Sequence, residues 1–152
     1  MKNLFKTLLV ALAAMLVAQA ATAARVVRTI DSGWRVALTA DNAAAVDFND
    51  KEWQQLNLPH SWNAQDAFDD VDGYTRTVGW YRRTLRINKA DNTRYTLRIG
   101  AANQYAEVYV NGALVGSHTG GYLAFSFDIT NQLQSGNNII AIKVDNSHND
   151  DI

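Results

Sequence analysis

Two short runs of aspartate are the first candidates for chemistry in this sequence. Asp69, Asp70 and Asp72 lie close together in one polar segment, and Asp150 and Asp151 are adjacent near the end of the 152 residues. Paired carboxyl groups can divide the roles of general acid, general base and nucleophile between them. Nothing in the spacing supports either run as such a pair, and loops are normally polar and exposed. We therefore interpret both runs as solvated loops and expect no catalytic residue.

The first of these runs also resembles part of a calcium-binding loop. Asp70, Asp72 and Gly73 match three positions of the D-x-D-x-D-G pattern. Phe68 then falls on the first ligand position and Gly79 on the twelfth, where an EF-hand loop requires carboxylates. The sequence does not predict a calcium site here.

Other metal ligands and nucleophiles are equally unsupported. The three histidines, His60, His118 and His148, are far apart and show no paired ligand spacing. The absence of cysteine excludes disulfides, thiolate metal sites and a thiol nucleophile. No serine lies in a G-x-S-x-G turn. We expect neither a metal ion nor a cofactor.

Aromatic side chains offer a different chemistry, because their rings stack on the apolar faces of sugars while amides and carboxylates bond the hydroxyl groups. Trp62, Tyr74, Trp80 and Tyr122 are available for this role. Trp80 and Tyr122 fall inside strand patterns, so we interpret both as core or domain-interface residues. The long polar segment 63–76 is the better place for ligand contact, since long loops in compact domains tend to be functional.

The elements that must position these residues are predicted to be short strands. Alternation of apolar and polar residues, the period-two pattern of a half-buried strand, recurs in the segments 33–38, 79–87, 95–99, 105–110, 125–129 and 140–144. In the segment 79–87, Tyr81 and Leu85 lie on one face and Arg82 and Arg86 on the other. No segment after residue 23 has a helical period. The pattern predicts an all-β sandwich or barrel.

The most specific local signal is a hairpin. Ala106, Val108 and Val110 alternate with polar residues, and Asn111 and Gly112 follow as a two-residue turn in which both can take positive φ. Farther on, the sequence predicts a turn at 128–133 that returns Leu133 to the core, and a second turn at Gly136 and Asn137.

Composition sets the class of protein. The chain is 47% hydrophobic and 19% charged, which is typical of one globular domain of ordinary size. The net charge of −1 gives no electrostatic reason to expect nucleic acid or an anionic membrane as a partner.

Residues 1–23 have the pattern of a cleaved signal peptide. Lys2 and Lys6 precede the uncharged, mostly apolar run 8–18, and A-x-A cleavage patterns follow at 18–20 and 21–23. The apolar run is shorter than the roughly 20 residues that a spanning helix needs. We expect a secreted or periplasmic protein without a membrane anchor, whose folded domain is 24–152.

Five motifs, in order, resemble the N-terminal sugar-binding domain of glycoside hydrolase family 2, the β-galactosidase and β-glucuronidase family. They are GWRVAL (33–38), LPHSW (58–62), GWYRRTLRI (79–87), EVYVNGALVGSHTGGYLAFSFDIT (107–130) and NNIIAIKVDNS (137–147). The resemblance implies a jelly-roll, galactose-binding-like β-sandwich. It also implies carbohydrate as ligand, with an immunoglobulin-like domain and a (β/α)₈ barrel as the partner domains of a larger glycosidase.

The sequence departs from the family pattern at its end. The loop and the G-[IL]-[YF]-R strand that follow VDNS in the family are not present, and neither is the barrel with its two catalytic glutamates. We therefore expect an incomplete sandwich that lacks its last strand or strands, and we expect the strand ending near Val144 to pair with sequence beyond Ile152. Such a chain is expected to be inactive alone.

Three functions from different classes are possible. The chain is either the non-catalytic sugar-binding domain of an exported β-glycosidase or a free-standing secreted carbohydrate-binding module; a structural interaction domain without sugar affinity is the third alternative. By resemblance, the segment 63–76 lies where some family members approach the sugar. We therefore assign Tyr74, Thr75 and Arg76 as the substrate contacts.

Overall fold

The computed structural model describes residues 24–39, 41–66, 68, 70 and 73–149. The chain divides into two units, residues 1–30 and 31–152. Within the first, residues 24–30 form neither helix nor strand, and the signal peptide predicted at 1–23 lies outside the described residues. The second unit contains the strands. Asp69, Asp72, Asp150 and Asp151, considered above as catalytic carboxylates, also lie outside the described part of the chain.

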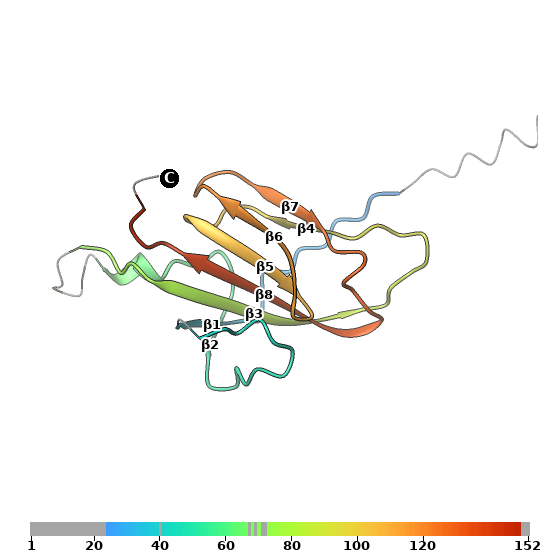
Figure 1. Ribbon diagram of the computed structural model, residues 1–152, viewed down its shortest axis with the longest axis horizontal. Helices are drawn as coiled ribbons and strands as arrows, with labels where there is room; N and C mark the ends of the chain where they lie inside the picture. Colours follow the sequence, from blue (N-terminus) through green and yellow to red (C-terminus); the bar gives the residue numbers. More distant parts are fainter. Residues whose placement is uncertain (1–23, 40, 67, 69, 71–72, 150–152) are drawn as a thin grey trace, which may run out of the picture. The chain divides into compact units, whose positions relative to one another are not determined.

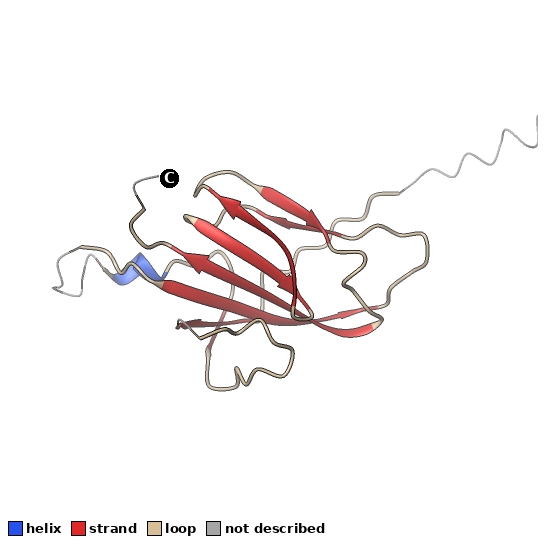
Figure 2. Cartoon of the chain, viewed as in Figure 1, coloured by secondary structure: helices blue, strands red, loops and turns tan. Residues whose placement is uncertain are grey.

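The second unit is all-β, as the sequence predicts (Figures 1 and 2). Its elements are β1 (Trp34–Leu38), β2 (Gln54–Leu56), the short 3₁₀ helix η1 (Trp62–Gln65), β3 (Val78–Ile87), β4 (Thr96–Ile99), β5 (Tyr105–Val110), β6 (Ala113–Thr119), β7 (Phe125–Asp128) and β8 (Gly136–Asp145). Six strands form one antiparallel sheet in the order β2-β1-β3-β8-β5-β6, and β4 pairs with β7 in a second. The two sheets make a β-sandwich.

Alternation along the strands supplies the core. Ala106, Val108 and Val110 on β5 are all 0% exposed, while the residues between them are only half-buried. The two sheets approach closely where β6 meets β7. A Cβ atom placed on Gly116 would lie 2.3 Å from the ring of Phe127, so only glycine fits there. Leu133 is also buried, which confirms that the turn after β7 returns it to the core.

The hairpin prediction is confirmed. Asn111 and Gly112 have φ angles of 51° and 82°, and they connect β5 to β6 as a two-residue turn between the paired residues Val110 and Ala113. This combination is the type I′ geometry, whose twist matches that of the strands it joins.

Two expectations about the last strand are wrong. Gly136 and Asn137 do not form a turn, because they are the first residues of β8 and pair with Ile87 and Arg86. The strand that ends near Val144 was also expected to pair with sequence beyond Ile152. Instead, β8 lies between β3 and β5 and pairs with both. Alternation shows which face a side chain takes, but it carries no information about which strands become neighbours.

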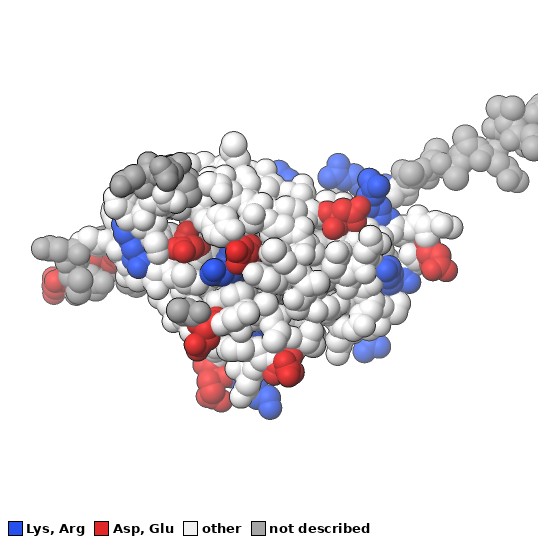
Figure 3. All heavy atoms as spheres, in the orientation of Figure 1, with Lys and Arg blue, Asp and Glu red and all other residues white. Residues whose placement is uncertain are grey.

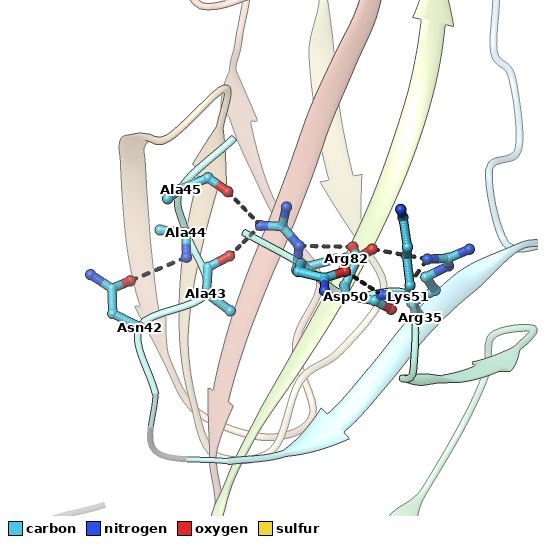
Figure 4. A network of polar contacts seen from close by, with 9 residues as sticks. Arg35, Asn42, Ala43, Ala44, Ala45, Asp50, Lys51 and Arg82 are labelled. Carbon is cyan, nitrogen blue, oxygen red and sulfur yellow. Dashed lines mark hydrogen bonds and ion pairs between the residues drawn. The ribbon is translucent and has the colours of Figure 1, made fainter. Parts of the chain in front are cut away.

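Arg82 is buried although it lies on the face opposite Tyr81, where the sequence places charged residues. It is 1% exposed because the loop 41–53 folds over this face of the sheet. Its Nε donates to Asp50 Oδ2 at 2.9 Å, and its Nη1 donates to the carbonyls of Ala43 and Ala45 (Figure 4). Arg35 reaches the other oxygen of Asp50 at 3.0 Å. The guanidinium group thus ties the loop to the sheet.

Replacing Gly112 with Val tests the hairpin. A β-branched residue is strained at a φ of 82°, so the free energy of unfolding should fall by about 1–3 kcal/mol. A thermal or denaturant melt of the variant measures this. An unchanged melt would show that the turn does not require positive φ at this position.

Replacing Asp50 with Ala tests the buried ion pair. The change leaves the Arg82 guanidinium without its countercharge, and it should lower the free energy of unfolding by about 2–4 kcal/mol. This is toward the low end for a buried pair because the Asp50 side chain is 22% exposed. Asp47→Ala, at an exposed position in the same loop, is the matched control and should change stability by no more than about 0.5 kcal/mol. Equal effects of the two substitutions would contradict the role given to Asp50.

Candidate functional site

The predicted sugar contacts lie at the end of the six-stranded sheet where β3 begins and β8 ends. Val78 and Asp145 are paired there, so the segment before β3 and the segment after β8 run side by side. Helix η1 lies beside the same end (Figure 1). Ser61 begins this helix by accepting a hydrogen bond from the Asn63 N–H at 3.2 Å.

The carbonyl oxygen of Thr75 is the centre of the site. It accepts hydrogen bonds from Trp62 Nε1 at 3.2 Å, from Asn63 Nδ2 at 2.9 Å and from Asn146 Nδ2 at 3.0 Å. These three donors come from helix η1 and from the residue after β8. One backbone group therefore joins three segments that are far apart in sequence.

Asp66 holds the other side of the same residue. Its Oδ2 accepts from the Thr75 N–H at 2.7 Å and from Asn63 Nδ2 at 2.6 Å, and its Oδ1 accepts from the Thr75 hydroxyl at 3.4 Å. The hydrogen bond from Asn63 and then the one from the Thr75 backbone hold the pKa of Asp66 below its usual value. The ionised carboxylate is thus the form that orders the loop.

Thr77 is anchored in a similar way. Its N–H donates to Asn146 Oδ1 at 2.7 Å, and its carbonyl accepts from the Asn146 N–H at 3.2 Å. Arg76 consequently lies between two residues whose backbones are both held. A side chain on such a segment is presented from a fixed backbone.

The ring of Trp62 packs on Gly79. A Cβ atom there would lie 2.7 Å from Cζ3 of the tryptophan, so the ring needs glycine at this position. Trp62 also lies beside Tyr81, with ring centroids 6.2 Å apart. Packing of this ring fixes η1 on the sheet and aims its Nε1 at Thr75.

The structure places the three predicted contacts in different roles. Tyr74 is 70% exposed and Arg76 is also exposed, so both side chains are available at the surface. Thr75 is exposed too, but its backbone and hydroxyl are engaged with Asp66, Asn63 and Asn146. Sugar contact by these three residues stays a prediction.

Sequence reasoning missed the residues that hold this segment. Asn63, Asp66 and Asn146 fix its backbone, yet none of them was singled out. The available signal was the position of Asn146 inside the VDNS motif, directly after a strand. An amide at a strand end is well placed to bond the backbone of a neighbouring loop.

The aromatic candidates Trp80 and Tyr122 differ in their exposure to solvent. Trp80 is 2% exposed, which confirms the core position, whereas Tyr122 is 91% exposed and a core position is wrong for it. A domain-interface position for Tyr122 stays a prediction. Tyr122 lies in the connection between β6 and β7, beyond the end of the strand pattern.

His60 and His118 have packing roles. His60 Nδ1 lies 3.1 Å from the Tyr81 hydroxyl, and burial lowers the pKa of His60. His118 stacks on Phe125 with ring centroids 4.2 Å apart. Within the described ranges, no three His, Asp or Glu side chains are grouped closely enough to hold a metal ion.

Surface charge is mixed. On the face seen in Figure 3, acidic and basic side chains are interspersed over the strands and loops, without a broad patch of one sign. Among the residues that the structure describes, no helix has the length and hydrophobicity to cross a membrane.

Comparison with known proteins identifies the class. Residues 27–151 match the family model described as "Glycosyl hydrolases family 2, sugar binding domain". The chain therefore belongs to glycosyl hydrolase family 2, through the sugar-binding domain of that family.

Individual relatives agree with this assignment. A β-glucuronidase of Formosa agariphila is 34% identical over 118 residues, which is 71% of this chain and 12% of that protein. A β-galactosidase of Bacteroides ovatus is 32% identical over 114 residues, 69% of this chain and 13% of the relative. The crystal structure of a Bacteroides uniformis β-glucuronidase superposes with a TM-score of 0.75 at 40% identity, covering 81% of this chain and 15% of that one. The chain thus spans about an eighth of the length of these curated relatives.

The pH dependence of the loop tests the role of Asp66. Because its pKa in the folded protein is lower than in the unfolded chain, its contribution to loop order is full above the ordinary aspartate pKa of about 3.9 and is lost as the pH falls through the lowered value. The NMR signal of the Thr75 amide, followed from pH 6 to about pH 2, should shift with this titration. The protection of this amide, its exchange rate relative to the intrinsic rate at the same pH, should fall at the acid end.

Asp66→Asn is the control for this measurement. The variant has no carboxylate at this position, so the acid transition at Thr75 should disappear. A transition that persists unchanged in the variant would assign it to another group and contradict the role of Asp66.

Proposed function

We propose that this chain is the non-catalytic, sugar-binding N-terminal domain of an exported family 2 β-glycosidase. In this proposal, hydrolysis belongs to a (β/α)₈ barrel of the longer protein. The domain binds carbohydrate at the Tyr74–Arg76 segment and helps to shape the site where the barrel acts. The apolar leader pattern of residues 1–23 supports export to the periplasm or the medium.

One observation carries this proposal. Tyr74 and Arg76 are exposed side chains on either side of Thr75, whose backbone is held by Asp66, Asn63 and Asn146. An aromatic ring can stack on a pyranose, and a guanidinium group donates paired hydrogen bonds to hydroxyl or carboxylate oxygens. Holding both on a fixed backbone reduces the entropy lost on binding.

The relatives suggest the class of sugar. Those compared above are named β-glucuronidases and a β-galactosidase. A β-glucuronide carries a carboxylate that the Arg76 guanidinium can bind in the two-pronged geometry, whereas a β-galactoside offers only hydroxyl groups. The proposed ligand is therefore a β-glycoside, with a preference for the uronide.

Isothermal titration of the full chain tests this function. Methyl β-D-glucuronide should bind in the millimolar range, more tightly than methyl β-D-galactoside. Arg76→Ala should weaken glucuronide binding by about tenfold or more, the loss of a charge-assisted hydrogen-bond pair. Tyr74→Ala should weaken both sugars, because the stacking surface does not depend on charge.

Arg98→Ala is the matched control, since Arg98 is also exposed but lies on β4 in the other sheet. It should leave both affinities unchanged. If neither sugar binds, or if the Arg76 and Arg98 substitutions have equal effects, the proposed site is contradicted.

A second function, a free-standing carbohydrate-binding module, is favoured by a single observation. β8 is paired along both edges, so the sandwich does not leave its last strand with an unpaired edge. A free-standing module would be monomeric only if its edge strands, β2 and β6, do not pair between chains. Sedimentation that shows self-association of the full chain would argue against this second function.

A further inference from the structure

The side-chain amide of Asn146 forms hydrogen bonds, through both its nitrogen and its oxygen, with residues that precede β3. Nδ2 donates to the Thr75 carbonyl at 3.0 Å and to Asn63 Oδ1 at 3.2 Å. Oδ1 accepts from the Thr77 N–H at 2.7 Å. Both amide protons and the amide oxygen are thus bonded: to Thr75 inside the Tyr74–Arg76 site, to helix η1 and to Thr77 just after the site.

The position of Asn146 in the fold makes it a firm attachment point. It directly follows β8, which pairs with ten residues of β3 and six residues of β5. Its own N–H bonds the Thr77 carbonyl at 3.2 Å, which extends the β3–β8 ladder by one residue. The amide therefore connects the loop to the most extensively paired strand of the sheet.

We propose that Asn146 is a positioning residue for carbohydrate binding, which fixes the backbone at Thr75 and Thr77 so that Tyr74 and Arg76 meet the sugar from one preset arrangement. This inference rests on the proposed function of the same loop. Asn146 itself need not touch the ligand. Its effect is preorganisation, since a site held within a narrow range of geometry binds better than the same residues on a loose loop.

The chemistry of the side chain explains why asparagine is required. Aspartate keeps an oxygen that can accept from the Thr77 N–H, but it cannot donate to the Thr75 carbonyl or to Asn63 Oδ1. Alanine removes all three bonds. The two substitutions Asn146→Asp and Asn146→Ala therefore separate the half of the contact that holds Thr77 from the half that holds Thr75.

Amide hydrogen exchange measured by NMR tests, without any ligand, whether Asn146 holds the loop. In the Ala variant, exchange at the Thr77 amide, which donates to Asn146 Oδ1, should rise by about five- to tenfold, the factor for loss of roughly one net hydrogen bond. The Thr75 amide keeps its acceptor, Asp66, so its exchange should rise by less, through the loss of the bond to the Thr75 carbonyl. In the Asp variant, which keeps an oxygen that can accept from the Thr77 N–H, exchange at Thr77 should rise less than in the Ala variant. The amides in the centre of β8, such as Ile140 and Ile142, should be unchanged, which shows that the sandwich remains folded.

Affinity for methyl β-D-glucuronide is the second measurement. Both Asn146 variants should bind about tenfold more weakly than wild type, with the exposure of Tyr74 and Arg76 unaltered. Asn137→Ala is the matched control, because Asn137 is an exposed asparagine at the opposite end of β8. It should leave both the affinity and the loop exchange rates at wild-type values.

The outcomes are distinguishable. Wild-type exchange rates at Thr75 and Thr77 in both Asn146 variants would contradict the claim that Asn146 holds the loop. Faster exchange with wild-type affinity for the sugar would contradict its role in binding. If the wild-type chain binds no sugar, the proposed function fails. The exchange rates then decide alone whether Asn146 positions the loop.

Discussion

The backbone polar groups of the loops at both ends of the sandwich depend on side-chain amides at the two ends of β8. Near its start, Asn138 is 0% exposed and bonds the N–H and the carbonyl of Gln134, together with the amide of Asn111. After its end, Asn146 bonds the backbone at Thr75 and Thr77. Backbone groups removed from water must find partners, so one strand in the middle of the sheet supplies them at each end.

This arrangement explains which parts of the fold could be predicted from sequence. Val108 and Val110 alternate with polar residues and are buried, and Asn111 and Gly112 need only local geometry to form the turn. These are properties of neighbouring residues. The burial of Arg82 depends instead on a loop more than thirty positions earlier in the chain folding over the sheet. Patterns of period two contain no information about such covering.

The candidate site shows the same division. The length and polarity of the segment 63–76, together with the family motifs, were enough to predict an exposed segment for ligand contact, and Tyr74 and Arg76 are exposed there. They did not show that Thr75 acts through its backbone, because its partner Asn146 is 71 positions away. The candidate site thus has two parts, exposed side chains and a backbone that other residues hold in place. The sequence predicted the exposed side chains, and only the three-dimensional contacts show how the backbone is held.

The central claim is that carbohydrate binds at the end of the sheet formed by the segments 73–77 and 146–147. Chemical-shift mapping of the ¹⁵N-labelled full chain with methyl β-D-glucuronide tests this claim most directly. The account predicts saturable shifts of the amides of residues 74–77 and of Asn146, with no response in the connection 89–94 at the opposite end of β3. Saturable shifts confined to that opposite end, or to β5 and β6, would contradict it.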